Sequence, residues 1–311
     1  MADFRSPPPP FGADETPAEI YWAEADDGLR LRLGLWRGTT ATAGTVLLFP
    51  GRTEYLEKYA PVAADLTAAG LSVLGIDWRG QGASQRLLSD PRPGHITDFA
   101  DYQRDVRVMV DLATRLDLPK PWHLLAHSMG AAIGLRALMN GLPVATAAFS
   151  APMWGIDTGR VPVGVALGLA QAAQVLGHTV KPVPGSGANG TYVLDSGFAG
   201  NLLTGSATAW ARMVAEADAW PDLTLGGATF GWVGAALREC RALARAPLPA
   251  IPSIVTLGSG EAIVSAAAIR ATCARWPSAR LITVEGGRHE ALFETAPRRA
   301  QVITALLTQF G

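Results

Sequence analysis

Cysteine is scarce in this chain of 311 residues, which contains only Cys240 and Cys273. Two cysteines are too few for a disulfide framework, and because no C-x-x-C pair occurs, we expect no metal site built on thiolates. Two thiols that need not pair fit a reducing compartment. Whether these two form a disulfide is left open by the sequence.

Charged residues are few as well. They make up 17% of the chain and nearly cancel, with a formal net charge of −1. No overall field would therefore recruit nucleic acid or an anionic membrane. No purely apolar run reaches about 18 residues, so no membrane-spanning helix is expected. The proline-rich first residues lack the basic start and apolar run of a secretory signal. We expect a cytoplasmic protein, and peripheral contact with the inner membrane stays open.

Apolar residues, by contrast, are abundant. They form 49% of the chain, which is enough for one large or two smaller globular domains. Between residues 20 and 149, short apolar runs such as Thr45–Phe49 alternate with segments of helical spacing such as residues 54–69. This alternation predicts an α/β fold with a mostly parallel sheet flanked by helices.

The alternation breaks in one long segment, where no buried-strand run is evident. Helical segments prevail there instead, among them residues 161–176 and 207–219. The sequence therefore predicts an insertion that covers the sheet. We predict four parts: an N-terminal arm at residues 1–18, the first part of an α/β core at 19–152, a helical cap insertion at 153–247, and the second part of the core at 248–311.

The most informative local pattern surrounds Ser128. This serine follows a short apolar run and precedes small, helix-forming residues, which is the pattern of a nucleophile elbow between a strand and a helix. Ala126 occupies the position where G-x-S-x-G has its first glycine. Because the alanine methyl group needs room beside the turn, we expect the helix to approach the strand through Gly130 and Ala131. By strand alternation, His127 should point away from the site.

A serine hydroxyl becomes nucleophilic when a histidine takes its proton and a carboxylate orients that histidine. Ser128, Glu261 and His289 each follow a predicted strand, in the chain order that hydrolases of the α/β type use. Since parallel strands end at one edge of a sheet, we predict that these three residues form a catalytic triad there. Asp157 is the alternative acid. Glu290 is expected to cap the helix that follows His289.

An acyl-transfer site also needs backbone N–H groups that face the developing oxyanion. One should belong to Met129, directly after the serine. The other should come from the loop after the first parallel strand, where Pro50 has no N–H and Gly51 allows a tight turn. The Arg52 N–H is then the expected second donor. In the alternative interpretation, Gly51 merely starts a helix.

Motifs for cofactors are not evident. We find no Walker loop and no H-E-x-x-H. Residues 185–190 match G-x-G-x-x-G, but prolines precede them and no helix clearly follows, so the context for dinucleotide binding is missing. We expect neither a cofactor nor a metal.

Further short motifs occur along nearly the whole chain after the N-terminal arm. They are Pro50-Gly51-Arg52, Asp77-Trp78-Arg79-Gly80-Gln81-Gly82, Gly94-His95, Ala126-His127-Ser128-Met129-Gly130, Ala151-Pro152-Met153, Asn201-Leu202-Leu203-Thr204 and Glu285-Gly286-Gly287. On these motifs, the chain resembles the lysophospholipase L2 and monoacylglycerol-lipase-like branch of the α/β-hydrolases, with a serine aminopeptidase S33-type domain. The resemblance implies a cofactor-free serine hydrolase with a helical cap. Ala126 is usual in this branch, and Glu261 corresponds to a position where monoacylglycerol lipases carry Asp.

We therefore expect a carboxylic ester hydrolase that acts on single-acyl lipids, a lysophospholipid or a monoacylglycerol, through an acyl-enzyme. The apolar cap would line the acyl pocket, or most of its residues would simply pack on the sheet. The side chains of Arg52 and Arg288 would favour a phosphate head group or be solvated. The alternatives are a small-ester carboxylesterase or acyltransferase with the same triad, and a non-catalytic binding module. The oligomeric state stays open.

Overall fold

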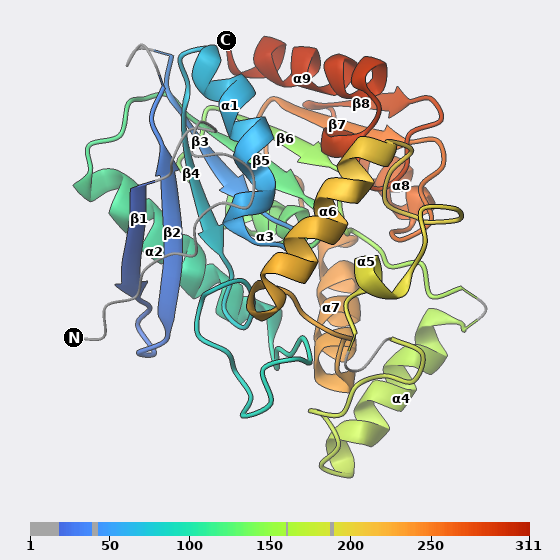
Figure 1. Cartoon of the computed structure of the whole chain (residues 1–311). Coiled ribbons are helices and arrows are strands. Elements are labelled where there is room, and N and C mark those ends of the chain that lie inside the picture. The colour runs from blue at the N-terminus through green and yellow to red at the C-terminus, as the bar shows by residue number, and fades with distance from the viewer. Residues whose placement is uncertain (1–18, 39–42, 160, 187–189) are drawn as a thin grey trace.

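An eight-stranded sheet forms the centre of the molecule (Figure 1). The computed structural model describes residues 19–38, 43–159, 161–186 and 190–311, so the predicted arm at residues 1–18 lies outside the described residues. The sheet order is β1-β2-β4-β3-β5-β6-β7-β8; β2 pairs antiparallel with β1 and with β4, and the other neighbours are parallel. The strands are β1 (Glu19–Glu24), β2 (Arg30–Trp36), β3 (Thr45–Phe49), β4 (Ser72–Asp77), β5 (Trp122–His127), β6 (Thr146–Ser150), β7 (Ser253–Gly258) and β8 (Ala279–Val284).

Helices cover both faces of this sheet, which is why the central strands are apolar throughout: every residue of β3 is buried. The side chains of α1 and α9 form one buried cluster with the sheet, and those of α2, α3 and α8 form the other. The predicted α/β class is confirmed. These helices are α1 (Ala60–Ala68), α2 (Tyr102–Arg115), α3 (Ser128–Met139), α8 (Ala266–Ala274) and α9 (Ala296–Phe310); short 3-10 turns are η1 (Leu56–Tyr59), η2 (Phe99–Asp101) and η4 (Ala291–Phe293).

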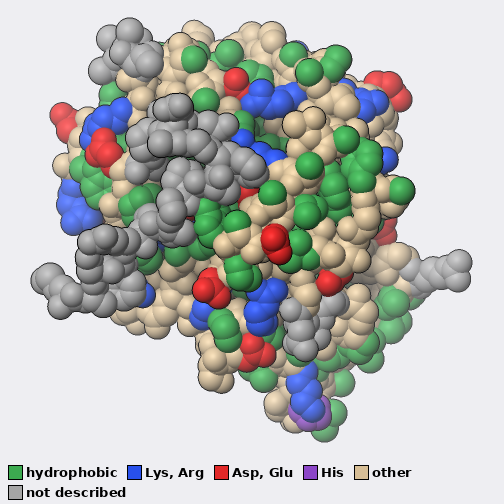
Figure 2. Space-filling model, in the orientation of Figure 1, with side chains coloured by type: hydrophobic (Ala, Val, Ile, Leu, Met, Phe, Trp, Pro, Cys, Tyr) green, Lys and Arg blue, Asp and Glu red, His purple; other side chains and the backbone are tan. Residues whose placement is uncertain are grey.

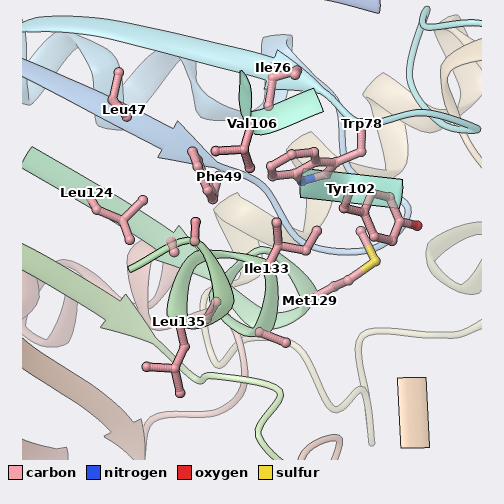
Figure 3. Close-up of a cluster of buried hydrophobic side chains, with 14 of the residues drawn as sticks. Leu47, Phe49, Ile76, Trp78, Tyr102, Val106, Leu124, Met129, Ile133 and Leu135 are labelled. Atoms are coloured by element: carbon pink, nitrogen blue, oxygen red, sulfur yellow. The ribbon is translucent and has the colours of Figure 1, made fainter. Parts of the chain in front are cut away.

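An aromatic cluster at the carboxyl end of β3 and β4 fixes the loop that follows β3 (Figure 3). The Trp78 ring packs edge-on against Phe49, with 5.0 Å between ring centroids, and against Tyr102, with 5.8 Å. Its indole Nε1 donates a hydrogen bond of 2.9 Å to the Pro50 carbonyl. The core therefore holds in place the loop where the oxyanion donor is predicted.

Small residues let α3 begin close to the sheet. A side chain at Gly130 would place its Cβ 2.2 Å from the Phe49 carbonyl oxygen, so this glycine faces the end of β3. Room for the Ala126 methyl group comes instead from Gly134, one turn later, where an added Cβ would lie 3.3 Å from the Ala126 Cβ. The predicted close approach through Gly130 is thus made to the end of β3, while the Ala126 methyl group itself is accommodated at Gly134.

Between β6 and β7 the described residues form helices: α4 (Val163–Val175), α5 (Tyr192–Asp195), α6 (Ala207–Ala219), η3 (Pro221–Leu223) and α7 (Phe230–Leu243). Helix α7 packs deeply, since Ala236 and Leu237 are buried beside α3, and α6 buries Met213 and Ala217. Helix α4 packs on α7 and extends away from the sheet (Figure 1). No helix of the described residues has the length and apolarity needed to cross a membrane.

The apolar segment at residues 161–176 takes neither role expected of the cap, whereas other cap residues, among them Met213 and Leu225, line a cavity beside Ser128. Helix α4 does not pack on the sheet, because α7 lies between them and takes its contacts through Ala170 and Ala173. Much of its apolar surface is exposed, including 54% of Leu169 and 82% of Val175. Hydrophobic side chains accordingly gather over α4 at the lower right of Figure 2.

Candidate active site

Ser128 lies at a sharp turn between β5, which ends at His127, and α3, which it begins. Its φ is +50°, in the left-handed region that a residue with a side chain adopts only at a cost. The Met153 N–H supports the turn by donating a hydrogen bond of 3.0 Å to the Ser128 carbonyl. This is the backbone geometry of a nucleophile elbow, which presents the hydroxyl at the carboxyl edge of the sheet.

The structure brings Ser128, His289 and Glu261 together. His289, in the loop after β8, lies with its Nε2 2.9 Å from the Ser128 Oγ and its Nδ1 2.8 Å from the Glu261 Oε2. A carboxylate can only accept at Nδ1, so that nitrogen carries the proton and Nε2 is free to accept the serine proton. The other carboxylate oxygen of Glu261 accepts from the N–H groups of Ile263 and Val264, at 2.8 and 3.1 Å.

Glu261 stays ionised in this position. Burial alone would raise its pKa, but the hydrogen bond from His289 and those from the backbone of Ile263 and Val264 outweigh burial, and the pKa of Glu261 lies below its usual value. The alternative acid, Asp157, is elsewhere: its carboxylate accepts the Gly159 N–H at 2.8 Å. The geometry therefore favours Glu261 as the group that orients His289.

The loop after β3 approaches the serine closely. A Cβ added to Gly51 would lie 3.1 Å from the Ser128 Cβ, so only glycine allows this approach without displacement. The Gln81 side chain donates a hydrogen bond of 2.8 Å to the Gly51 carbonyl and holds the loop. Within the described part of the chain, the Arg52 N–H has no acceptor. Met129 is the second residue of α3, where an N–H has no partner within the helix.

Four buried ionisable residues lie behind the triad, and the sequence analysis missed this arrangement. Glu54, Lys58, His127 and Glu290, here called the charged cluster, are each at most 8% exposed. Lys58 Nζ donates to Glu54 at 2.5 Å and to Glu290 at 2.7 Å. The Glu54 carboxylate also accepts the Gly51 N–H. The cluster thereby joins the loop of the predicted oxyanion donor to Glu290, the residue next to His289.

Two predictions fail at this cluster. Glu290 precedes η4 but makes no capping hydrogen bond with its side chain, because the buried Lys58 ammonium pairs with it. His127 does not point away from the site but lines the cavity there, with its ring centroid 4.9 Å from that of His289. His127 is still extended and paired in β5. Alternation places it on the same face as Leu125, which packs with Ala291 and Leu292 just after His289, so this face is the side of the site.

The surroundings of His127 favour a charged imidazole. Its Nδ1 lies 3.0 Å from the Ser150 carbonyl, which can only accept, so this nitrogen carries a proton. Its Nε2 lies 3.4 Å from a Glu290 oxygen and 3.7 Å from a Glu54 oxygen. Without a proton, the Nε2 lone pair would face two negatively charged carboxylates, which is unfavourable. Burial disfavours the charged ring, but the charges of Glu290 and Glu54 outweigh it and raise the pKa of His127.

Carboxylate and imidazole atoms of Glu54, His127 and Glu290 lie within 4.8 Å of one another, a spacing that could hold a metal ion. The Lys58 ammonium already lies between the two carboxylates, however, and supplies the positive charge there. We therefore assign these residues to ion pairing and propose no metal site.

The only sequence signal for the charged cluster is weak. Glu54 and Lys58 are four residues apart, a spacing that brings side chains together on a helical turn. Nothing in the sequence relates them to Glu290, which lies 232 residues beyond Lys58. The contact forms because β3 and β8 both end at the same edge of the sheet.

Replacing Glu290 with Gln should destabilise the protein by about 3–5 kcal/mol, because Lys58 would lose a buried partner charge. The matched control is Glu239→Gln, which breaks the pair with Arg136 nearer the surface and should cost at most about 1 kcal/mol. Urea unfolding of both variants beside wild type measures the two losses. Equal losses would contradict a structural role for the charged cluster.

The difference between wild type and Glu290→Gln should also depend on pH. The pKa of Glu290 is well below its usual 4.5, since Lys58 and His127 outweigh the effect of burial; its contribution is therefore present above pH 4.5 and lost as the pH falls below that value. His127 has a pKa above its usual 6.5, so its contribution is present below pH 6.5 and lost as the pH rises. The difference in unfolding free energy should be largest between these two values. A difference that does not vary with pH would contradict the pairing.

A cavity of about 400 Å³ opens beside Ser128. Arg288 does not line it, because its guanidinium donates to the carbonyls of Asn201 and Thr204, at 2.8 and 3.0 Å. No described residue of α4 lines it either. Most of its wall is apolar, with contributions from Met153, Ile156, Val193, Leu202, Leu203, Met213, Ala217, Leu225, Trp232, Ile263 and Val264.

Comparisons with known proteins agree with this geometry. The profile of a protein family described as Serine aminopeptidase, S33, matches residues 40–296. Lysophospholipase L2 of Escherichia coli (strain K12) is 33% identical over 284 residues, covering 86% of this chain and 80% of that protein. A monoacylglycerol lipase of Mycolicibacterium smegmatis is 31% identical over 159 residues, covering 50% of this chain and 53% of that protein.

Among solved structures, a soluble variant of monoglyceride lipase from Saccharomyces cerevisiae, in complex with a substrate analog, has a similar fold. Its TM-score is 0.75, and the comparison covers 98% of both chains. The sequence identity is 18%, so this likeness concerns the fold alone.

Proposed function

Because the chain belongs to the serine aminopeptidase S33 family of the α/β-hydrolases, we propose that it is a serine hydrolase that cleaves the carboxylic ester of single-acyl lipids. The family takes its name from a peptidase, whereas the relatives that match most of this chain are named for lipid esters. One observation carries the proposal: the Ser128–His289–Glu261 hydrogen-bonded chain opens into a mostly apolar cavity.

The proposed reaction proceeds through an acyl-enzyme. His289 Nε2 takes the Ser128 proton as the oxygen attacks the ester carbonyl, and Glu261 stabilises the imidazolium that forms. The N–H groups of Arg52 and Met129 bind the oxyanion. The protonated His289 then gives its proton to the leaving alcohol. Water, activated by the same histidine, releases the fatty acid. No cofactor is needed for these steps.

The main alternative is an esterase or acyltransferase for small soluble esters with the same residues. A series of p-nitrophenyl esters of increasing acyl length separates the two. We expect kcat/KM to rise to medium or long chains, because each buried methylene stabilises binding by about 0.8 kcal/mol. A maximum at two to four carbons would contradict the lipid proposal. A non-catalytic binding module would cleave none of the series.

We also propose that the exposed apolar side of α4 rests on a lipid surface, where single-acyl lipids reside. The helix Val163–Val175 contains no charged residue, and Val165 and Leu169 are each more than half exposed. Burial of such side chains stabilises adsorption by about 1 kcal/mol each. The double variant Val165→Ser/Leu169→Ser should therefore bind zwitterionic vesicles about 30-fold more weakly in flotation assays.

The control for this change is Leu194→Ser, which removes an exposed apolar side chain from α5 and should leave vesicle binding near the wild-type level. Equal flotation of wild type and the double variant would contradict the membrane contact. A dimer of wild type that the double variant abolishes in gel filtration would assign the surface to a second copy of the chain instead.

A further inference from the structure

Arg52 contributes to the wall of the cavity. Its backbone N–H lies in the loop beside Ser128, while its side chain runs to Gly94 and Trp232, which with Arg52 also line a second, smaller hollow. There Nη2 donates to the Gly226 carbonyl at 2.8 Å, and the guanidinium carbon lies 5.1 Å from the centre of the Trp232 ring. Gly94 leaves room for it, because a Cβ at that position would come within 2.6 Å of Nη2.

The charge of this guanidinium is not compensated within the described part of the chain. No described carboxylate forms an ion pair with Arg52, and its Nε is buried without a hydrogen-bond partner. Burial lowers the pKa of Arg52 to about 10, which leaves it charged at neutral pH. The most deeply buried arginines are paired with carboxylates, Arg32 with Asp77 and Arg79 with Asp105, whereas Arg52 and Arg86 contact backbone carbonyls. A buried cation without a counter-ion is costly, and an anionic ligand group would remove that cost.

Polar side chains line the cavity at two places. The triad serine and histidine and the charged cluster lie at one of them. At the other, Thr224 and Gly226 line the cavity beside Arg52, together with the apolar Leu225 and Trp232, and the Thr191 hydroxyl donates to the Thr224 hydroxyl at 2.9 Å. The rest of the wall is mostly apolar, so a molecule with one charged head at Arg52 and one acyl chain suits this lining.

The separation between the backbone N–H and the guanidinium of Arg52 matches that between the ester and the phosphate of a glycerophospholipid. About six covalent bonds separate its backbone nitrogen from the guanidinium carbon. About as many separate the ester carbonyl carbon from phosphorus in a 1-acyl glycerophospholipid. A carbonyl oxygen at the Arg52 N–H therefore allows the phosphate to reach the guanidinium of the same residue.

We propose that the Arg52 guanidinium is a phosphate subsite, which binds the head group of a single-acyl glycerophospholipid and selects it over a neutral monoacylglycerol. This inference rests on the proposed function and names its head group. The phosphate accepts hydrogen bonds from the guanidinium while the acyl chain lies along the apolar remainder of the cavity. Arg288, whose guanidinium is bound to backbone carbonyls, takes no part.

The test compares two substrates with the same acyl chain, 1-acylglycerol 3-phosphate and 1-acylglycerol, both below their aggregation concentrations. The measured quantity is the ratio of their kcat/KM values. Arg52→Met should lower this ratio about 10- to 100-fold, the loss expected for charge-assisted hydrogen bonds. Arg52→Lys, which keeps a charge, should lower it less. An unchanged ratio in Arg52→Met would overturn the subsite.

The matched control is Arg86→Met. Arg86 also donates to backbone carbonyls of the same segment, those of Asp222 and Thr224, but it does not line the cavity. The ratio should stay at the wild-type value in this variant. A loss equal to that of Arg52→Met would show that the effect comes from the packing of the segment and would overturn the proposal.

A binding measurement separates this inference from the proposed function. Glycerol 3-phosphate should slow the labelling of Ser128 by a fluorophosphonate in wild type and should not slow it in Arg52→Met. If wild type cleaves neither lipid, the proposed function fails, while this protection still reports on the subsite. Equal protection by inorganic phosphate would assign the subsite to a free anion and overturn the head-group proposal; no protection by either compound would overturn the subsite.

Discussion

Ser128→Ala is expected to lower kcat toward ester substrates by about 10⁶-fold, the loss that removal of a triad nucleophile produces. The reason is that no other group of the site can form the acyl-enzyme: His289 Nε2 lies against the Ser128 oxygen at 2.9 Å. The measurement is the rate of fatty-acid release, together with covalent labelling by a fluorophosphonate. Residual catalysis of about 10³–10⁴ over water is expected to remain, because the oxyanion donors are still present.

The control for Ser128→Ala is Ser259→Ala. Ser259 lies in a loop at the same edge of the sheet, and its hydroxyl donates to Glu285 at 3.0 Å. It should keep activity and labelling near wild type, since substitutions away from a site have small effects. Labelling that persists in Ser128→Ala would assign the nucleophile to another residue and contradict the proposed mechanism.

The sheet could be predicted because its strands carry their own signal. Runs such as Thr45–Phe49 are apolar at every position, which is typical of a strand covered on both faces. Membership of the α/β-hydrolases, predicted from the motifs, is confirmed by the family match over residues 40–296. The exposure of α4 could not be predicted, because an apolar composition does not distinguish a buried helix from one that lies exposed on the far side of α7.

Part of the candidate site could likewise be predicted from the sequence, and part of it could not. Ser128, Glu261 and His289 could be named because each follows a strand of one parallel sheet, and such strands end at one edge. Their hydrogen bonds have the geometry expected of a triad, while their catalytic roles and the four-part division of the chain stay predictions. The charged cluster could not be named, because the contact of Lys58 with Glu290 depends on packing rather than on any local pattern.

Glu261→Gln should lower kcat by about 10⁴-fold, although glutamine has nearly the same shape as glutamate. The backbone explains why. The N–H groups of Ile263 and Val264 donate to one carboxylate oxygen of Glu261, so the glutamine carbonyl will take that place. Its NH₂ group must then face Nδ1 of His289. That nitrogen would have to accept, which moves the ring proton to Nε2 and removes the base that Ser128 needs.

The comparison variant is Asp157→Asn, which alters the alternative acid in the same chemical way. Its carboxylate contacts the Gly159 N–H rather than His289, so kcat should stay near wild type. Glu261→Asp keeps the charge but shortens the reach to Nδ1, so the kcat of this variant should fall between those of Glu261→Gln and Asp157→Asn.

The ring proton can be followed directly, because nitrogen NMR of His289 should show a proton on Nδ1 in wild type and on Nε2 in Glu261→Gln. A large loss in Asp157→Asn with little change in Glu261→Gln would reverse the assignment. A large loss in Glu261→Gln with little change in Asp157→Asn would show that Ser128 becomes nucleophilic because Glu261 holds the ring proton of His289 on Nδ1.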